Sequence, residues 1–197
     1  MRVAIMSSSK IGKRCEDWVR KHMQKGWKIS TPNSADIIVS VFYRNLFKHK
    51  FIRTKLLIVN FHGGILPDYR GSATYAWAII NKEKETGVTV HVIDDEKIDN
   101  GDIISVEKFR IEKNDTTEDL FNKGEELAFK MFKKNFNKIM NMSFSKIRNV
   151  PTAGKLYLRK DFQKAKDLTR YVRAFTYKDK ESAFYFNSKG KKIHLKW

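Results

Sequence analysis

Two polar residues, Asn60 and His62, follow directly after an apolar run at residues 56–59. Four large apolar residues in succession predict a strand that is covered on both faces. Because alternate residues of a strand share a face, we expect Asn60 and His62 to lie side by side at its carboxyl end, where open α/β sheets bind ligands. An amide donor beside an imidazole can stabilise an oxyanion and move a proton, which is the chemistry of acyl transfer.

A third candidate residue, Asp99, lies in the acidic segment at residues 94–102, after an alternating strand pattern at residues 87–93. Alone, an Asp next to Asn-Gly is most often a turn residue, and a single Asn or His is equally unspecific. Near His62, however, Asp99 can orient the imidazole and take up the proton that an attacking amine loses, directly or through water. His91 has no such neighbours in the sequence and is interpreted as a structural or surface residue.

Four ordered motifs between residues 60 and 104 resemble those of the folate-dependent formyltransferases. They are Asn60-x-His62, Leu66-Pro67-x-Tyr69-Arg70-Gly71, Thr86-Gly87-Val88-Thr89-Val90 and Asp99-x-Gly101-Asp102-Ile103-Ile104. Members of that family act on glycinamide ribonucleotide, on methionyl-tRNA and on nucleotide-linked amino sugars. Farther along, Arg173-Ala174-Phe175-Thr176 resembles the tail that follows the catalytic core in the methionyl-tRNA and sugar branches.

The resemblance implies a catalytic set of Asn60, His62 and Asp99, with 10-formyltetrahydrofolate as the formyl donor. Backbone groups of two loop segments would read the donor's ring, with contacts expected at Tyr43, Arg44, Leu46, Asp94, Asp95, Glu96 and Ile98. The acceptor is expected to contact Arg70, Tyr75, Trp77, Ser9 and Lys10. This chemistry needs no metal, and the five His residues are too dispersed in the sequence to suggest one.

The acceptor is chosen among the three branches partly by exclusion. Against glycinamide ribonucleotide, the turn at residues 7–12 lacks a glycine-rich phosphate loop; against methionyl-tRNA, that branch carries a C-terminal β-barrel that is not expected in this chain. A nucleotide-linked amino sugar, most simply a thymidine diphosphate sugar, is therefore preferred. A basic RNA-binding protein on an inactive formyltransferase fold is the non-enzymatic alternative, and the presence of Asn60, His62 and Asp99 together speaks against it.

The amino-acid composition indicates which kinds of partner and which cellular compartment to expect. The net charge is +18, from 40 Lys and Arg against 22 Asp and Glu, which favours an anionic substrate. Because the Lys residues are scattered, most of this charge is read as a solvated surface, and no nucleic-acid partner is expected. No apolar segment approaches the ~20 residues of a membrane span. With a short apolar run at residues 3–6 and a single cysteine, Cys15, a cytoplasmic protein without disulfides is expected.

The elements expected around these motifs alternate between strand and helix, which predicts an α/β fold. We expect a doubly wound, Rossmann-like formyltransferase core with a compact N-terminal half, because many family members place an extra strand and helix before the Asn60 strand. The predicted strands cover residues 3–6, 35–42, 56–62, 87–93 and 103–111, and the predicted helices cover residues 13–25, 46–52, 72–81 and 118–140. Ser72 is the predicted cap of the third helix, and residues 27–33 are predicted to be a connection.

Residues 1–150 are assigned to the catalytic core and residues 151–197 to a small, β-rich appendage. The appendage is predicted to hold a helix near residues 161–175 and a hairpin between residues 184 and 195. Its aromatic-rich part, residues 175–197, is too small to hold a core alone, so we expect it to support a homodimer. A base-stacking role is assigned to an aromatic residue of this tail, either Phe184 or Tyr185.

Overall fold

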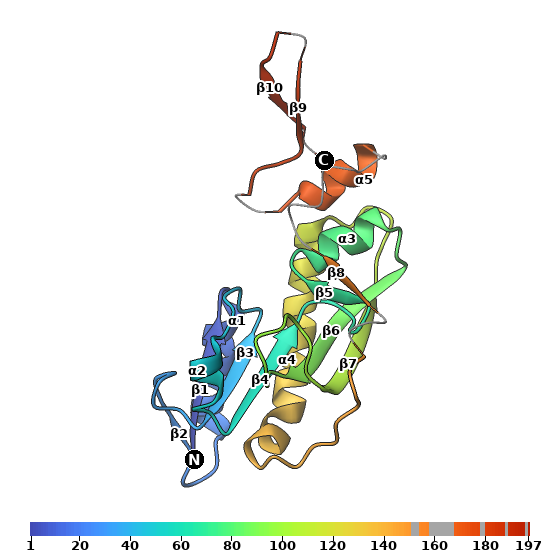
Figure 1. Cartoon of the computed structure of the whole chain (residues 1–197). Coiled ribbons are helices and arrows are strands. Elements are labelled where there is room, and N and C mark those ends of the chain that lie inside the picture. Colours follow the sequence, from blue (N-terminus) through green and yellow to red (C-terminus); the bar gives the residue numbers. More distant parts are fainter. Residues whose placement is uncertain (151–153, 158–167, 178–179, 188, 196) are drawn as a thin grey trace.

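The computed structural model describes residues 1–150, 154–157, 168–177, 180–187, 189–195 and 197, and its centre is a six-stranded sheet (Figure 1). The strand order is β2 (Lys28–Ile29), β1 (Arg2–Ser7), β3 (Ile37–Val41), β4 (Leu57–His62), β6 (Glu85–Val92) and β7 (Ile103–Arg110). The first four strands are parallel, β6 is antiparallel to β4, and β7 is antiparallel to β6. The predicted α/β class is confirmed, with an antiparallel pair at one edge of the sheet.

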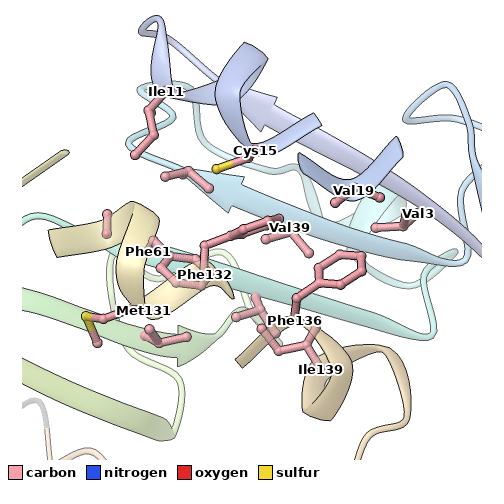
Figure 2. Close-up of a cluster of buried hydrophobic side chains, with 14 of the residues drawn as sticks. Val3, Ile11, Cys15, Val19, Val39, Phe61, Met131, Phe132, Phe136 and Ile139 are labelled. Carbon is pink, nitrogen blue, oxygen red and sulfur yellow. The ribbon is translucent and has the colours of Figure 1, made fainter. Parts of the chain in front are cut away.

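One face of the sheet is covered by α1 (Ile11–His22) and α4 (Thr117–Met140), and it holds the largest hydrophobic cluster (Figure 2). Val39 and Phe61 of the sheet and Phe132 and Phe136 of α4 are completely buried there. Trp18 of α1 meets Phe132 and Phe136 edge to face, with ring centroids 5.9 and 5.7 Å apart. This contact between the two helices closes the cluster from outside.

The opposite face changes character along the strands. Near their amino ends it is apolar, because Ala4, Ile38 and Ile58 pack against Ile52 of α2 (His49–Ile52). Toward their carboxyl ends it is polar. Since β3 and β4 are parallel, their carboxyl ends meet at the same edge of the sheet, and their polar side chains gather there.

The C-terminal part of the chain returns to the core at two places. β8 (Lys155–Tyr157) pairs in parallel with β5 (Tyr69–Gly71), and α5 (Leu168–Phe175) packs on α3 (Thr74–Ile80). Beyond α5, β9 (Phe184–Phe186) and β10 (Lys192–His194) form an antiparallel hairpin that extends away from the core in Figure 1. The expected β-rich tail is present, and the division of the chain at residue 150 stays a prediction.

Several predicted boundaries differ from the structure. β2 and β5 lie in segments that were expected to be a connection and a loop, and α1 starts at Ile11 rather than at residue 13. The predicted cap Ser72 is wrong: the residue before α3 is Ala73, which has φ 58° and makes no side-chain cap. Of the helix predicted near residues 161–175, residues 161–167 lie outside the described residues.

Among the described residues, we find no helix of sufficient length and apolarity to span a membrane.

Candidate active site

A row of polar side chains crosses three neighbouring strands on the polar face. The register pairs Ser40 of β3 with Asn60 of β4, and Asn60 with His91 of β6. The Ser40 hydroxyl donates to Asn60 Oδ1 at 2.8 Å, and Asn60 Nδ2 donates to His91 Nε2 at 3.1 Å. These two bonds fix which way the amide points. Because an amide nitrogen carries two hydrogens, one remains for a ligand.

His91 is the residue that sequence reasoning missed. It was expected to be structural or at the surface; at 1% exposure the surface alternative is wrong, whereas the structural one is compatible with its burial, and its contact with Asn60 was not foreseen. Its Nδ1 lies 2.9 Å from the Val92 carbonyl oxygen, which can only accept, so Nδ1 carries the proton and the neutral ring accepts from Asn60 through Nε2. Because His91 alternates with Val88, Val90 and Val92, the sequence predicts that it lies on the opposite face of its strand from these valines. That it lies next to Asn60 follows only from the pairing register of β6 and β4.

Asp99 and Tyr69 hold the ring of His62 between two acceptors. His62 Nδ1 is 3.5 Å from Asp99 Oδ2, and Nε2 donates to the Tyr69 carbonyl oxygen at 2.7 Å. The same carboxylate accepts the Gly71 N–H at 2.8 Å and lies 3.4 Å from His91 Nε2. The predicted catalytic residues are therefore neighbours in space, and His62 can reach a ligand oxygen only by exchanging its bond to Tyr69.

The charge of Asp99 is stabilised by its surroundings. Burial alone would raise the pKa of this carboxyl, but the His62 ring and the Gly71 N–H hold it well below its usual range. A carboxylate with such a low pKa is a weak base. Asp99 is thus suited to orient His62 and to attract a positive charge, with a water molecule receiving the proton that an amine loses.

A cavity of about 590 Å³ opens on Asn60, His62 and Asp99. One wall is formed by residues 42–47 after β3 and by residues 93 and 95–101 after β6. Six of the seven expected cofactor contacts line it, and Asp94 does not: they are Tyr43, Arg44, Leu46, Asp95, Glu96 and Ile98. Leu46 is 61% exposed, so this wall offers apolar surface to a ligand.

Of the expected acceptor contacts, Tyr75 lines the cavity, whereas the other four occupy other places. Arg70 Nε donates to the Ile98 carbonyl oxygen at 3.1 Å and so supports the acidic loop from behind. The Trp77 ring packs on the Tyr157 ring, with centroids 5.0 Å apart. Ser9 and Lys10 lie in the turn before α1, where Lys10 is the residue preceding the helix.

The second wall of the cavity comes largely from the C-terminal part of the chain, where sequence reasoning expected Phe184 or Tyr185 to contribute and did not assign the residues that do. Its residues belong to the start of α4 and to α5 and the segment that follows, namely Thr117, Phe121, Ala174, Phe175, Tyr177 and Lys180. Arg44 of the first wall hydrogen-bonds Tyr177 of the second. The tail therefore completes the cavity.

In the described part of the chain, no group of three or more His, Cys, Asp and Glu residues is arranged to hold a metal ion.

Sequence comparisons match the chain to known proteins over its central part. The family model described as "Formyl transferase" matches residues 17–135. The bifunctional polymyxin resistance protein ArnA of Wigglesworthia glossinidia brevipalpis is 43% identical over 89 residues, 45% of this chain and 14% of ArnA. GDP-perosamine N-formyltransferase of Brucella melitensis is 42% identical over 89 residues, 45% of this chain and 34% of that protein.

A methionyl-tRNA formyltransferase also matches. The enzyme of Lactobacillus acidophilus is 36% identical over 118 residues, 59% of this chain and 37% of that protein. The chain thus spans well under half the length of these three relatives.

Solved structures extend the likeness to the whole fold. A sugar N-formyltransferase from Shewanella sp. FDAARGOS_354 has a TM-score of 0.81 at 19% identity, covering 100% of this chain and 97% of that one. The N-formyltransferase from Helicobacter canadensis, solved with folinic acid and dTDP-3-aminofucose, has a TM-score of 0.76 at 23% identity, covering 89% and 81%. At these identities the likeness establishes the fold.

Proposed function

The chain belongs to the formyl transferase family, and on that premise we propose that it transfers a formyl group from 10-formyltetrahydrofolate to the amine of a nucleotide-linked amino sugar. One observation carries the proposal: Asn60, His62 and Asp99 line a single cavity of about 590 Å³ together with the residues of both walls. A reaction between two substrates needs such a meeting point, because the amine and the formyl carbon must be held within bonding reach.

The donor is assigned to the wall formed by residues 42–47, 93 and 95–101. Exposed Leu46 and the partly buried Ile98 suit the faces of a flat ring, and backbone groups of the acidic loop suit its polar edge. The folinic acid in the Helicobacter canadensis structure supports a folate at this fold. When bound, 10-formyltetrahydrofolate supplies the formyl carbonyl; the residues described here orient that carbonyl and stabilise its charge.

Asn60 and His62 act on the formyl oxygen. As the amine nitrogen bonds to the formyl carbon, that oxygen becomes negative, and the free N–H of Asn60 donates to it. One such donor typically lowers the activation barrier by about 2.7–4 kcal/mol. His62 becomes the second donor when its Nε2–H leaves the Tyr69 carbonyl. The bond from the formyl carbon to N10 then breaks, N10 takes a proton, and the amine gives its proton to water beside Asp99.

The acceptor is assigned to the wall contributed by the tail. Phe121, Phe175 and Tyr177 offer ring faces for a base, and Lys180 offers a cation for a diphosphate. Phe184 was expected to stack on the base, but it lies in the C-terminal hairpin and does not line the cavity, so this role is proposed for the three aromatic residues above. The side chain of Tyr185, the other expected residue, lies outside the described residues. We propose thymidine diphosphate as the carrier, as in the ligand of the Helicobacter canadensis enzyme.

Homodimer formation is proposed through the C-terminal hairpin. Phe186 is 65% exposed on β9, and an apolar ring at such a position is best covered by a second copy of the hairpin. Light scattering should give twice the monomer mass for the native protein. Phe186→Ser should shift the protein toward monomer; a native protein that is monomeric at assay concentration would exclude this assembly.

Methionyl-tRNA is the second candidate acceptor. The identity of 36% to the Lactobacillus acidophilus enzyme and the net charge of +18 favour it. Against it, the tail wall is compact and aromatic, which suits one nucleotide better than a folded RNA.

An acceptor panel decides between these substrates. The native protein is incubated with 10-formyltetrahydrofolate and, in separate reactions, with dTDP-, UDP- and GDP-linked amino sugars, glycinamide ribonucleotide and methionyl-tRNA; products are identified by mass. A dTDP amino sugar should have the highest kcat/KM. If methionyl-tRNA or glycinamide ribonucleotide is better, the acceptor assignment is wrong; if no acceptor is formylated, the proposed activity is wrong.

A further inference from the structure

Asn149 lies in the segment that follows α4 and runs back along β7 (Figure 1). Ile147 anchors that segment by forming an antiparallel bridge with Ile103, with backbone hydrogen bonds of 2.7 and 2.8 Å in the two directions. The match to the family model ends at residue 135. Asn149 therefore reaches the site from a part of the chain that the family model does not cover.

The side chain of Asn149 binds the backbone of the catalytic turn. It is 5% exposed, and its Nδ2 donates to the Asp99 carbonyl oxygen at 3.0 Å and to the Gly101 carbonyl oxygen at 3.2 Å. Its Oδ1 is buried and has no hydrogen-bond partner among the described residues. An amide with an unsatisfied oxygen in this position contributes through its two N–H groups alone.

The turn that Asn149 binds has an unusual backbone. Asp99 has φ 46°, in the left-handed region that non-glycine residues seldom adopt. At Gly101, a Cβ would lie 2.0 Å from the Val92 carbonyl oxygen, so that position accepts only glycine. Such a conformation persists only where the surroundings hold it. Among these surroundings, Asn149 is the side chain that binds both carbonyl groups of the turn.

We infer that Asn149 is a positioning residue for formyl transfer, because it holds the Asp99 backbone in the one conformation that aims the carboxylate at His62, His91 and the Gly71 N–H. This inference rests on the proposed function for its kinetic consequence. Without the two donated bonds the turn relaxes, and Asp99 no longer fixes the ring of His62. A displacement of about 1 Å in a supporting group can cost about 100-fold in rate.

The test compares Asn149→Ala and Asn149→Asp with Asn135→Ala. Asn135 is a matched control: it is 7% exposed and donates to the Met131 carbonyl oxygen at 2.8 Å, but within α4. Asn149→Ala should lower kcat by about 10- to 100-fold with little change in either KM, whereas Asn135→Ala should leave kcat unchanged. Asn149→Asp keeps the size and shape of the side chain but places an oxygen atom against the carbonyl oxygens of Asp99 and Gly101. Its loss of kcat should therefore be at least as large as that of Asn149→Ala. It also serves as the test variant if the alanine variant does not fold.

A second readout does not depend on activity. The carboxyl carbon of Asp99 is followed by NMR as pH falls, in the native protein and in each variant. The groups facing this carboxylate are His62, His91 and the Gly71 N–H. The midpoint of the Asp99 titration should rise toward the ordinary Asp value in both Asn149 variants and stay unchanged in Asn135→Ala. The inference would be overturned if Asn149→Ala and Asn135→Ala had equal kcat, or if the Asp99 midpoint did not change in the Asn149 variants. If the native protein were inactive, the proposed function would be overturned, and the NMR result alone would decide the role of Asn149.

Discussion

Strand β4 has two faces that serve different purposes. Val59 and Phe61 are completely buried against the helices α1 and α4, where they belong to the largest hydrophobic cluster. Asn60 and His62, their immediate neighbours in the chain, face Ser40, His91 and Asp99. Packing and chemistry are thus separated by the alternation of the strand rather than by distance along the sequence. Substitutions at adjacent residues should therefore change different measured quantities.

The largest effect should come from Phe61→Ala on the packed face. Deleting a completely buried phenylalanine side chain typically costs about 3–5 kcal/mol, because the transfer free energy is lost and a cavity remains. Urea unfolding followed by circular dichroism measures the change in the free energy of unfolding. A loss below about 1 kcal/mol would mean that the two faces are not separated as described.

Asn60→Ala should affect catalysis instead. The loss of one oxyanion donor should lower kcat by about 10²–10³-fold. The free energy of unfolding should fall by less than it does for Phe61→Ala, because the variant leaves only Ser40 and His91 without a partner. Both quantities are measured on the same preparation, and near-native kcat would remove Asn60 from the catalytic set.

Asp99→Asn should separate charge from shape and reveal a pH dependence. The folded pKa of Asp99 lies below its unfolded value, so the carboxylate contributes stability that is fully present above the unfolded value of about 3.9 and is lost as pH falls toward the folded value. The stability difference between native protein and variant should therefore be constant above about pH 5 and shrink below pH 4. Unfolding curves across this range measure it; a constant difference would contradict the assignment, as would near-native kcat in the variant at neutral pH.

The smallest effect should come from Arg14→Gln on the outer surface of the packed face. The Arg14 guanidinium forms a bidentate pair with Glu126 at 2.5 and 3.1 Å and joins α1 to α4, but both side chains are largely exposed. Such pairs contribute about 0–1 kcal/mol and are screened by salt. Unfolding at low and high ionic strength measures the change, which should diminish with salt and leave kcat unaltered.

Local patterns were enough to predict most of the sheet and to place Asn60 and His62 on one face of β4, whereas Asp99 was added through the family resemblance, and the catalytic roles of the three residues stay predictions. The apolar run before Asn60 and the alternation of Val88, Val90 and Val92 each describe one strand, and strand geometry then orients the side chains. His91 was missed because its role depends on the antiparallel register between β6 and β4, which joins residues 31 positions apart. No local pattern encodes such a pairing.

An aromatic residue of the tail was expected at the site, but the tail residues that line the cavity escaped prediction for the same reason. Asn149 contacts Asp99 across 50 residues of sequence, and Tyr177 contacts Arg44 across more than twice that separation. The short strands β5 and β8 have little propensity of their own and exist because they pair with each other.

The return of the C-terminal segment to the core has a consequence for the order of events during translation. The sheet and its hydrophobic cluster are complete once α4 has emerged from the ribosome, since none of the described residues beyond Met140 belongs to that cluster. Folding can therefore begin while the chain is still being made. Asn149, β8 and the tail wall come later, so the nascent protein passes through a stage with a packed core and an unfinished cavity. The cavity is complete only after α5 and the segment that follows it have been made, when the core that receives these segments is already formed.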